Sequence, residues 1–150
     1  DQADTLTIQN PEPVTDPWNS TTIKVLPNQF IVNDDSGRPA MIEDDGTDEL
    51  GVRAFGTTEE LYAFVKIPDG WKATHVQVHA SASTSSAVSV NPYNYQTGDT
   101  SAVSVSNGDF NANIDITDIP ASATQDVVIG VQPASSSTVI YGATVTIATV

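Results

Sequence analysis

Almost a third of the 150 residues carry a side chain that branches at Cβ: the chain has 17 Val, 11 Ile and 18 Thr, against only 4 Leu. Branched side chains have restricted χ1 angles and fit a pleated sheet better than a helix. Leu, a good helix former, is nearly absent. This composition predicts a chain that is built mostly or wholly of β-strands.

The spacing of the apolar runs indicates how these strands are arranged. Between residues 21 and 150 we expect about eight to ten strands, separated by turns at the intervals of about 8–12 residues typical of sandwiches and barrels. The expected fold class is all-β, an antiparallel β-sandwich of jelly-roll or Ig-like type with an extended Pro-rich N-terminal arm. Residues 1–20 would form the arm and residues 21–150 the sandwich domain. No run is long and apolar enough for a transmembrane helix.

Two neighbouring strands are expected to pair as a hairpin. Residues 61–67 form the most apolar run and predict a buried strand, while residues 72–80 alternate with a period of two. Pro68-Asp69-Gly70 between them is a favourable turn sequence. The alternation places Ala73 and His75 on the same face of the second strand.

Two further segments have an expected pairing or interruption. The pentapeptide SAVSV at residues 86–90 recurs at residues 101–105, which predicts two antiparallel strands around a turn. Residues 22–33 predict either one strand interrupted by Pro27-Asn28 or two short strands.

The N-terminal arm contains the candidate interface residues. Pro11, Pro13 and Pro17 fall within seven residues, which excludes a helix and a central strand. Trp18 follows them as a large apolar anchor. These four residues are the candidate partner contacts, although packing on the domain's own surface is the favoured interpretation of Trp18.

The charge balance excludes several partners. The chain has 19 acidic and 5 basic residues, a formal charge of −14, and no cysteine. A surface this negative repels phosphate backbones, so no nucleic-acid partner is expected. Without thiols there is no disulfide framework, zinc–cysteine site or cysteine nucleophile. The first ten residues lack the pattern of a signal peptide, and no membrane partner is expected.

Candidate metal and catalytic sites are weak. His75 and His79 would lie about 13 Å apart along a strand, too far to share an ion. The acidic turns between Asp34 and Glu49 contain oxygen ligands suited to calcium but lack the ordered spacing of an EF-hand. A solvated acidic surface is the favoured interpretation, and calcium stays open. We expect no cofactor, no metal site, no catalytic residues and no enzymatic activity.

Several short strings carry a resemblance to a known group of proteins. They are IKVLPNQF at 23–30, NDD at 33–35, IEDD at 42–45, LYAFVKIPDGWKATHV at 61–76 and VIYGATVTIA at 139–148. From about residue 23 to residue 150 the chain resembles small virion-associated proteins of marine tailed phages, especially cyanophages. The resemblance implies a structural protein of the virus particle, without catalytic residues.

The expected function follows from this resemblance and from the predicted shape. We expect a virion structural protein that decorates the outer capsid surface through contacts of the sandwich and the arm. Its partners would be the major capsid protein or other virion proteins, and it would form a homo-oligomer. One alternative is a tail-fibre module that binds a receptor or a carbohydrate, with Trp71, Tyr93 and Tyr95 stacking on sugars. Another is a cell-surface filament subunit that assembles by strand addition.

Overall fold

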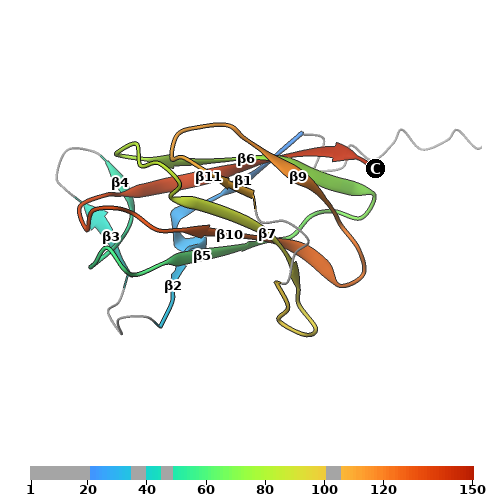
Figure 1. Cartoon of the computed structure of the whole chain (residues 1–150), viewed down its shortest axis with the longest axis horizontal. Coiled ribbons are helices and arrows are strands. Elements are labelled where there is room, and N and C mark those ends of the chain that lie inside the picture. Colours follow the sequence, from blue (N-terminus) through green and yellow to red (C-terminus); the bar gives the residue numbers. More distant parts are fainter. Residues whose placement is uncertain (1–20, 35–39, 45–48, 101–105) are drawn as a thin grey trace, which may run out of the picture.

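The computed structural model describes residues 21–34, 40–44, 49–100 and 106–150, which form two antiparallel sheets packed face to face (Figure 1). The elements in chain order are β1 (Thr22–Val25), the 3-10 turn η1 (Pro27–Gln29), β2 (Ile31–Val32), β3 (Ala40–Asp44), β4 (Leu50–Ala54), β5 (Leu61–Val65), β6 (Trp71–Ala80), β7 (Val88–Asn94), β8 (Ser106–Gly108), β9 (Ile114–Pro120), β10 (Gln125–Val131) and β11 (Ile140–Thr149). The predicted antiparallel β-sandwich is confirmed, and the described residues contain eleven strands rather than eight to ten.

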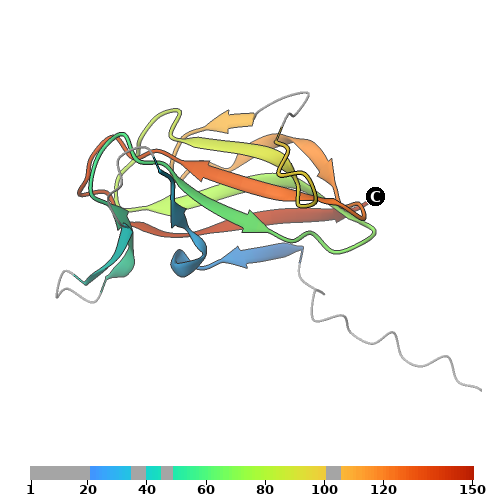
Figure 2. The same cartoon turned by 90° about the horizontal axis from the view of Figure 1, so that it is seen from below.

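Each sheet has a central strand, β11 or β10, that pairs with neighbouring strands on both sides. The six-stranded sheet has the order β3-β4-β11-β6-β9, and β1 also pairs with β11. The five-stranded sheet has the order β2-β5-β10-β7-β8. Figure 2 shows this sheet from its outer side, with β5, β10 and β7 lying side by side. Every registered pair of strands is antiparallel, and most pairs join strands that are distant in sequence, such as β5 with β10 and β6 with β11.

The core lies between the two sheets, where alternate residues of each strand meet. In the six-stranded sheet, Val76 and Val145 are fully buried, and in the five-stranded sheet Val127 and Ile129 are fully buried. Removing these apolar side chains from water is the main favourable term in folding. The period of two along each strand therefore determines which face of the sheet turns inward.

On one side, β11 pairs with two different strands at different points along its length. Ile140 pairs with Val52 of β4, whereas residues 143–146 pair with β1. Gly142 lies at the irregularity between these ladders and has φ +150°. A Cβ atom at this position would lie 2.5 Å from the carbonyl oxygen of Val25, so glycine is needed where β1 ends against β11.

The predicted hairpin of residues 61–67 with residues 72–80 is wrong. β5 belongs to the five-stranded sheet and β6 to the six-stranded sheet, so the turn between them carries the chain from one sheet to the other. Trp71 N–H donates to the carbonyl of Pro68 at 3.0 Å, and Gly70 adopts φ +82°. The turn itself is therefore as expected, but the strands on either side of it do not pair.

The prediction that Ala73 and His75 lie on the same face of β6 is also wrong. His75 and Ala73 pair with the adjacent residues Thr146 and Ile147 of β11, so a β-bulge at this point gives β6 one extra residue relative to β11. Ala73 is fully buried in the core, whereas His75 is partly exposed. The extra residue reverses the alternation, so the two side chains lie on opposite faces.

Other expectations fall partly or wholly outside the described residues. Residues 22–33 form two short strands, one in each sheet, as one of the two alternatives predicted. β7 pairs with β8 at residues 106–108, while the predicted partner segment 101–105 lies outside the described residues. The arm, with Pro11, Pro13, Pro17 and Trp18, also lies outside them.

Core packing gives a direct test with two isoleucines. Ile129→Ala removes a fully buried side chain from β10 and should lower the free energy of unfolding by about 2–5 kcal/mol. Ile31→Ala, at a position 63% exposed in β2, should change it by about 0.5 kcal/mol or less. Urea denaturation followed by circular dichroism measures both. Equal effects would contradict the assignment of the core.

Candidate functional site

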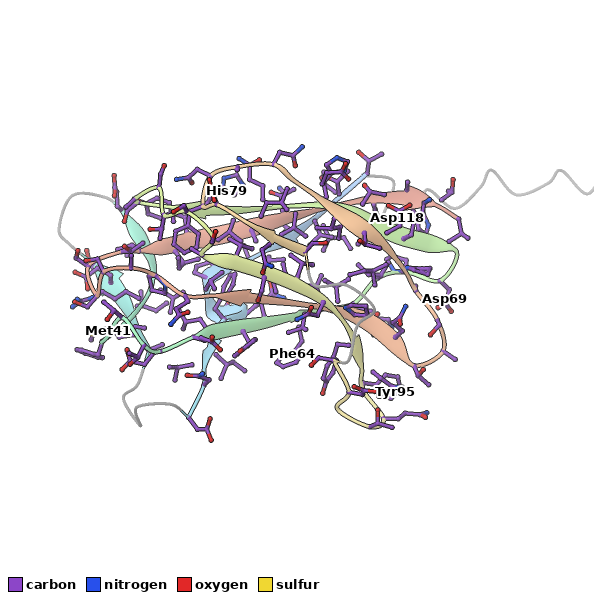
Figure 3. All side chains as sticks on the ribbon, in the orientation of Figure 1. Met41, Phe64, Asp69, His79, Tyr95 and Asp118 are labelled. Carbon is purple, nitrogen blue, oxygen red and sulfur yellow. The ribbon has the colours of Figure 1, made fainter. Side chains whose placement is uncertain are left out.

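The outer faces of the two sheets differ in chemistry. On β6, β9 and β11 of the six-stranded sheet, polar side chains point outward: His79 contacts the Thr144 hydroxyl at 3.2 Å, and Lys72 pairs with Asp118 at 2.6 Å. The outer face of the five-stranded sheet instead carries three aromatic rings. Polar outer faces are the usual arrangement for an antiparallel sandwich, so the five-stranded sheet departs from it. Figure 3 shows His79 on one side of the molecule and Phe64 on the other.

The register of three strands brings these outward residues together in rows. Tyr62 pairs with Gly130 and Gly130 with Ser89, and in the next row Phe64 pairs with Val128 and Val128 with Asn91. Tyr93 pairs with Asp126 beyond them. We call this surface the aromatic face, defined by Tyr62, Phe64, Ser89, Asn91, Tyr93, Val128 and Gly130.

Phe64 and Tyr93 form the centre of the aromatic face. Their ring centroids lie 4.8 Å apart with an interplanar angle of 61°, an edge-to-face arrangement. Between their strands lies Val128, which is only 3% exposed although it points away from the core. Phe64 itself remains 48% exposed. The face thus combines a small apolar cluster with a ring that is open to solvent.

Tyr62 is held at the edge of this cluster. A Cβ atom at position 130 would lie 3.0 Å from Tyr62 Cε1 and 2.6 Å from Ser89 Oγ, so the missing side chain of Gly130 leaves room for the Tyr62 ring. The Tyr62 hydroxyl donates to Glu60. The backbone N–H of Asn33 donates a hydrogen bond to the backbone carbonyl of Glu60 at 2.8 Å, which fixes the position of Glu60. These contacts restrain the ring on the sheet surface.

A hollow of about 330 Å³ adjoins the rings. Its lining combines Tyr62, Phe64 and Tyr93 with the polar side chains of Ser89 and Asn91. Asn91 Oδ1 is buried and has no hydrogen-bond partner within the described part of the chain. A buried acceptor without a donor is unfavourable, which sets this amide apart from the other polar groups of the face.

The aromatic residues that the sequence suggested for sugar stacking are only partly brought together. Tyr93 lies in the aromatic face, and Tyr95, 57% exposed, follows it in the next turn. Trp71 lies on the other sheet and packs against the core, so it does not join them. Tyr62 and Phe64 were missed because the run 61–67 predicted a buried strand, and no exposed face was assigned to it. Its alternation already places both residues on one side.

The two histidines and the acidic turns form no metal centre in the described residues. His75 Nε2 lies 3.8 Å from Asp115, and no group of three or more His, Cys, Asp or Glu suited to a metal occurs in the ranges that the structure describes. Glu43 pairs with Arg53 at 2.5 Å, and Glu49 accepts a hydrogen bond from Tyr141 at 2.6 Å. Three further acidic residues of these turns, Asp35, Asp45 and Asp48, lie outside the described ranges, so calcium binding there stays a prediction.

Within the described ranges, no helix has the length and apolar character needed to span a membrane.

No protein-family model matches the chain, and no curated protein matches its sequence. Among solved structures it is similar to the CBM36-1 domain of a multidomain xylanase from the hindgut metagenome of Trinervitermes trinervoides, with 11% identity, a TM-score of 0.48 and coverage of 86% of this chain and 99% of that one. It is also similar to a carbohydrate-binding module, CBM36, in complex with calcium and xylotriose, with 8% identity, a TM-score of 0.40 and coverage of 86% and 100%. At such values the function of this chain must be argued from its own residues.

The ring pair can be tested by a double-mutant cycle. Phe64→Ala, Tyr93→Ala and the double variant should show a coupling of about 0.5–1.5 kcal/mol in urea denaturation, because the rings are in contact. Phe55→Ala, which removes a 37%-exposed ring that follows β4 in the other sheet, should combine with Tyr93→Ala additively to within about 0.5 kcal/mol. Additivity of the first pair would show that the contact contributes nothing to stability.

Proposed function

We propose that this chain is a non-catalytic carbohydrate-binding module and that the aromatic face is its binding surface. The observation that carries the proposal is Phe64, which stands about half exposed in the middle of the five-stranded sheet. Tyr62 and Tyr93 lie beside it, and Asn91 and Ser89 line the same hollow. An apolar surface with a few polar groups around it is the usual composition of a small-ligand site.

The chemistry of a sugar ring matches this surface. A pyranose has C–H groups on its faces and hydroxyl groups around its rim. The C–H groups pack against an exposed aromatic ring such as Phe64 and are thereby removed from water. The Asn91 amide and the Ser89 hydroxyl offer both donors and acceptors to the hydroxyl groups at the rim. Binding of this kind needs no activated nucleophile, metal or acid–base pair.

A purely structural role explains less of the face. The rings could serve only to cover Val128, as aromatic side chains do over gaps in a sheet. Covering Val128 is already complete at 3% exposure, yet Phe64 keeps 48% of its surface in water. The hollow and the buried acceptor of Asn91 beside it also have no role in covering Val128. A bound ligand would account for the exposed ring and for the hollow beside it.

The test is a binding measurement on a polysaccharide panel. Phe64→Ala should weaken binding at least about tenfold, or about 1.4 kcal/mol, because the stacking surface is lost. Phe55→Ala is the matched control, since it removes an exposed ring from elsewhere and should leave binding unchanged. Affinity electrophoresis on immobilised glucans, mannans and xylans gives the hits, and isothermal titration calorimetry gives the affinity. Wild-type protein that binds no polysaccharide, or binding unaffected by Phe64→Ala, would refute the proposal.

A second candidate is the virion structural protein expected from the sequence resemblance. The β3–β4 ladder at one end of the sandwich favours it (left in Figure 1). Met41, Ile42 and Leu50 on this ladder are 39%, 54% and 61% exposed. Exposed apolar residues on an edge strand are typical of protein–protein contacts. This surface is separate from the aromatic face, so a protein could attach to a particle through one and bind a glycan through the other.

In this second candidate the partner is the major capsid protein or another copy of the chain, and the location is the outer surface of the particle. Both stay predictions. Ile42→Asp should reduce co-sedimentation with capsids of a marine tailed phage at least about tenfold, because it places a charge in an apolar contact. Phe64→Ala should leave co-sedimentation unchanged. Wild-type protein that does not co-sediment, or an Ile42→Asp variant that does so normally, would contradict this candidate.

A further inference from the structure

Three hollows follow one another along β10 on the outer side of the five-stranded sheet. The central one, beside the rings, is lined by Val128. A second, of about 400 Å³, is lined by Asp126 together with Lys66 and Tyr95. A third, of about 190 Å³, is lined by residues 130–132. Along β10 the second hollow therefore comes first, at Asp126; the central hollow follows at Val128, and the third lies at residues 130–132.

The hollows are connected through shared or adjacent residues. Ser89 lines both the central and the third hollow. Tyr93 lines the central hollow and pairs with Asp126, which lines the second. On β5, Phe64 and Lys66 are two residues apart and point to the same face. Figure 3 shows Phe64 and Tyr95 on the same side of the molecule.

The length of this series exceeds a single sugar. From Asp126 to Gln132 the backbone advances six residues, or about 20 Å at about 3.3 Å per residue. That distance is several times the width of one pyranose ring. A monosaccharide would occupy only the central hollow and leave Tyr95 and Asn107, at opposite ends of the series, without contact.

The charges along the series select against acidic ligands. Its lining carries three carboxylates, from Glu60, Asp69 and Asp126, and one ammonium group, from Lys66. The chain as a whole has a formal charge of −14. Uronate or sulfate groups would be repelled by these carboxylates, whereas the hydroxyl groups of a neutral sugar bind them as hydrogen-bond donors.

From this arrangement we infer that the aromatic face is the central subsite of a longer groove for an uncharged, linear polysaccharide, with end subsites at Tyr95 and at Asn107. The inference rests on the proposed carbohydrate-binding function and specifies its ligand.

The experiment compares ligand lengths by isothermal titration calorimetry. The probes are the disaccharide and the hexasaccharide of the neutral glucan, mannan or xylan that binds best, and alginate oligosaccharides of the same lengths. Wild-type protein should bind the neutral hexasaccharide at least about tenfold more tightly than the disaccharide, since additional subsites are filled. Tyr95→Ala and Asn107→Ala should each weaken hexasaccharide binding about fivefold and leave disaccharide binding unchanged. Alginate hexasaccharide should bind at least about tenfold more weakly than the neutral one at low salt.

The outcomes separate this inference from the proposed function. Equal affinities for the neutral disaccharide and hexasaccharide, both lost in Phe64→Ala, would refute the groove but keep the carbohydrate site. Hexasaccharide binding unaffected by both Tyr95→Ala and Asn107→Ala would also refute the end subsites. Tighter binding of alginate would overturn the assignment of a neutral ligand. Binding that survives Phe64→Ala for every probe, or no binding at all, would refute the proposed function itself. Phe55→Ala serves again as the matched control.

Discussion

The structure depends most on the burial of β10 from both sides. Its inward residues, Val127 and Ile129, are fully buried in the core, and its outward residue Val128 is covered by the rings of the neighbouring strands. A slip of one residue against β5 or β7 would exchange these faces and expose the core side chains, so the register is strongly determined. The same register aligns Tyr62, Phe64 and Tyr93 on the outer surface. Folding and the formation of the candidate site are thus one event.

The two sheets have different tasks in this arrangement. The six-stranded sheet presents polar groups that are paired with one another, such as Lys72 with Asp118 and His79 with Thr144. Such partly exposed pairs contribute little to stability. The five-stranded sheet presents exposed rings beside the polar side chains of Ser89 and Asn91. A ligand that packs against these rings would remove apolar surface from water, which is the proposed basis of recognition.

Much of the fold was predictable because it depends on local chemistry. Branched side chains, a period of two and frequent turn sequences are sufficient to predict an antiparallel sandwich. Pairing between distant strands was not. Pro68-Asp69-Gly70 forms the predicted turn, but a turn of this kind suits both a hairpin and a crossing between sheets. The crossing occurs here because β5 and β6 each bury their apolar face from opposite sides of the same core.

In the candidate site, too, local features could be predicted from the sequence, whereas the arrangement of distant strands could not. Composition and alternation by themselves determined that the chain is all-β, that its surface is acidic, and that Tyr62, Phe64 and Lys66 share one face of a strand. Only the tertiary structure decided that this face points outward, that Tyr93 joins it and Trp71 does not, and that Gly130 leaves space for a ring. The bulge at Ala73 likewise became visible only against β9 and β11. The physical reason is that periodicity is a property of one strand, whereas the exposure of a face depends on which strands and which sheet cover it.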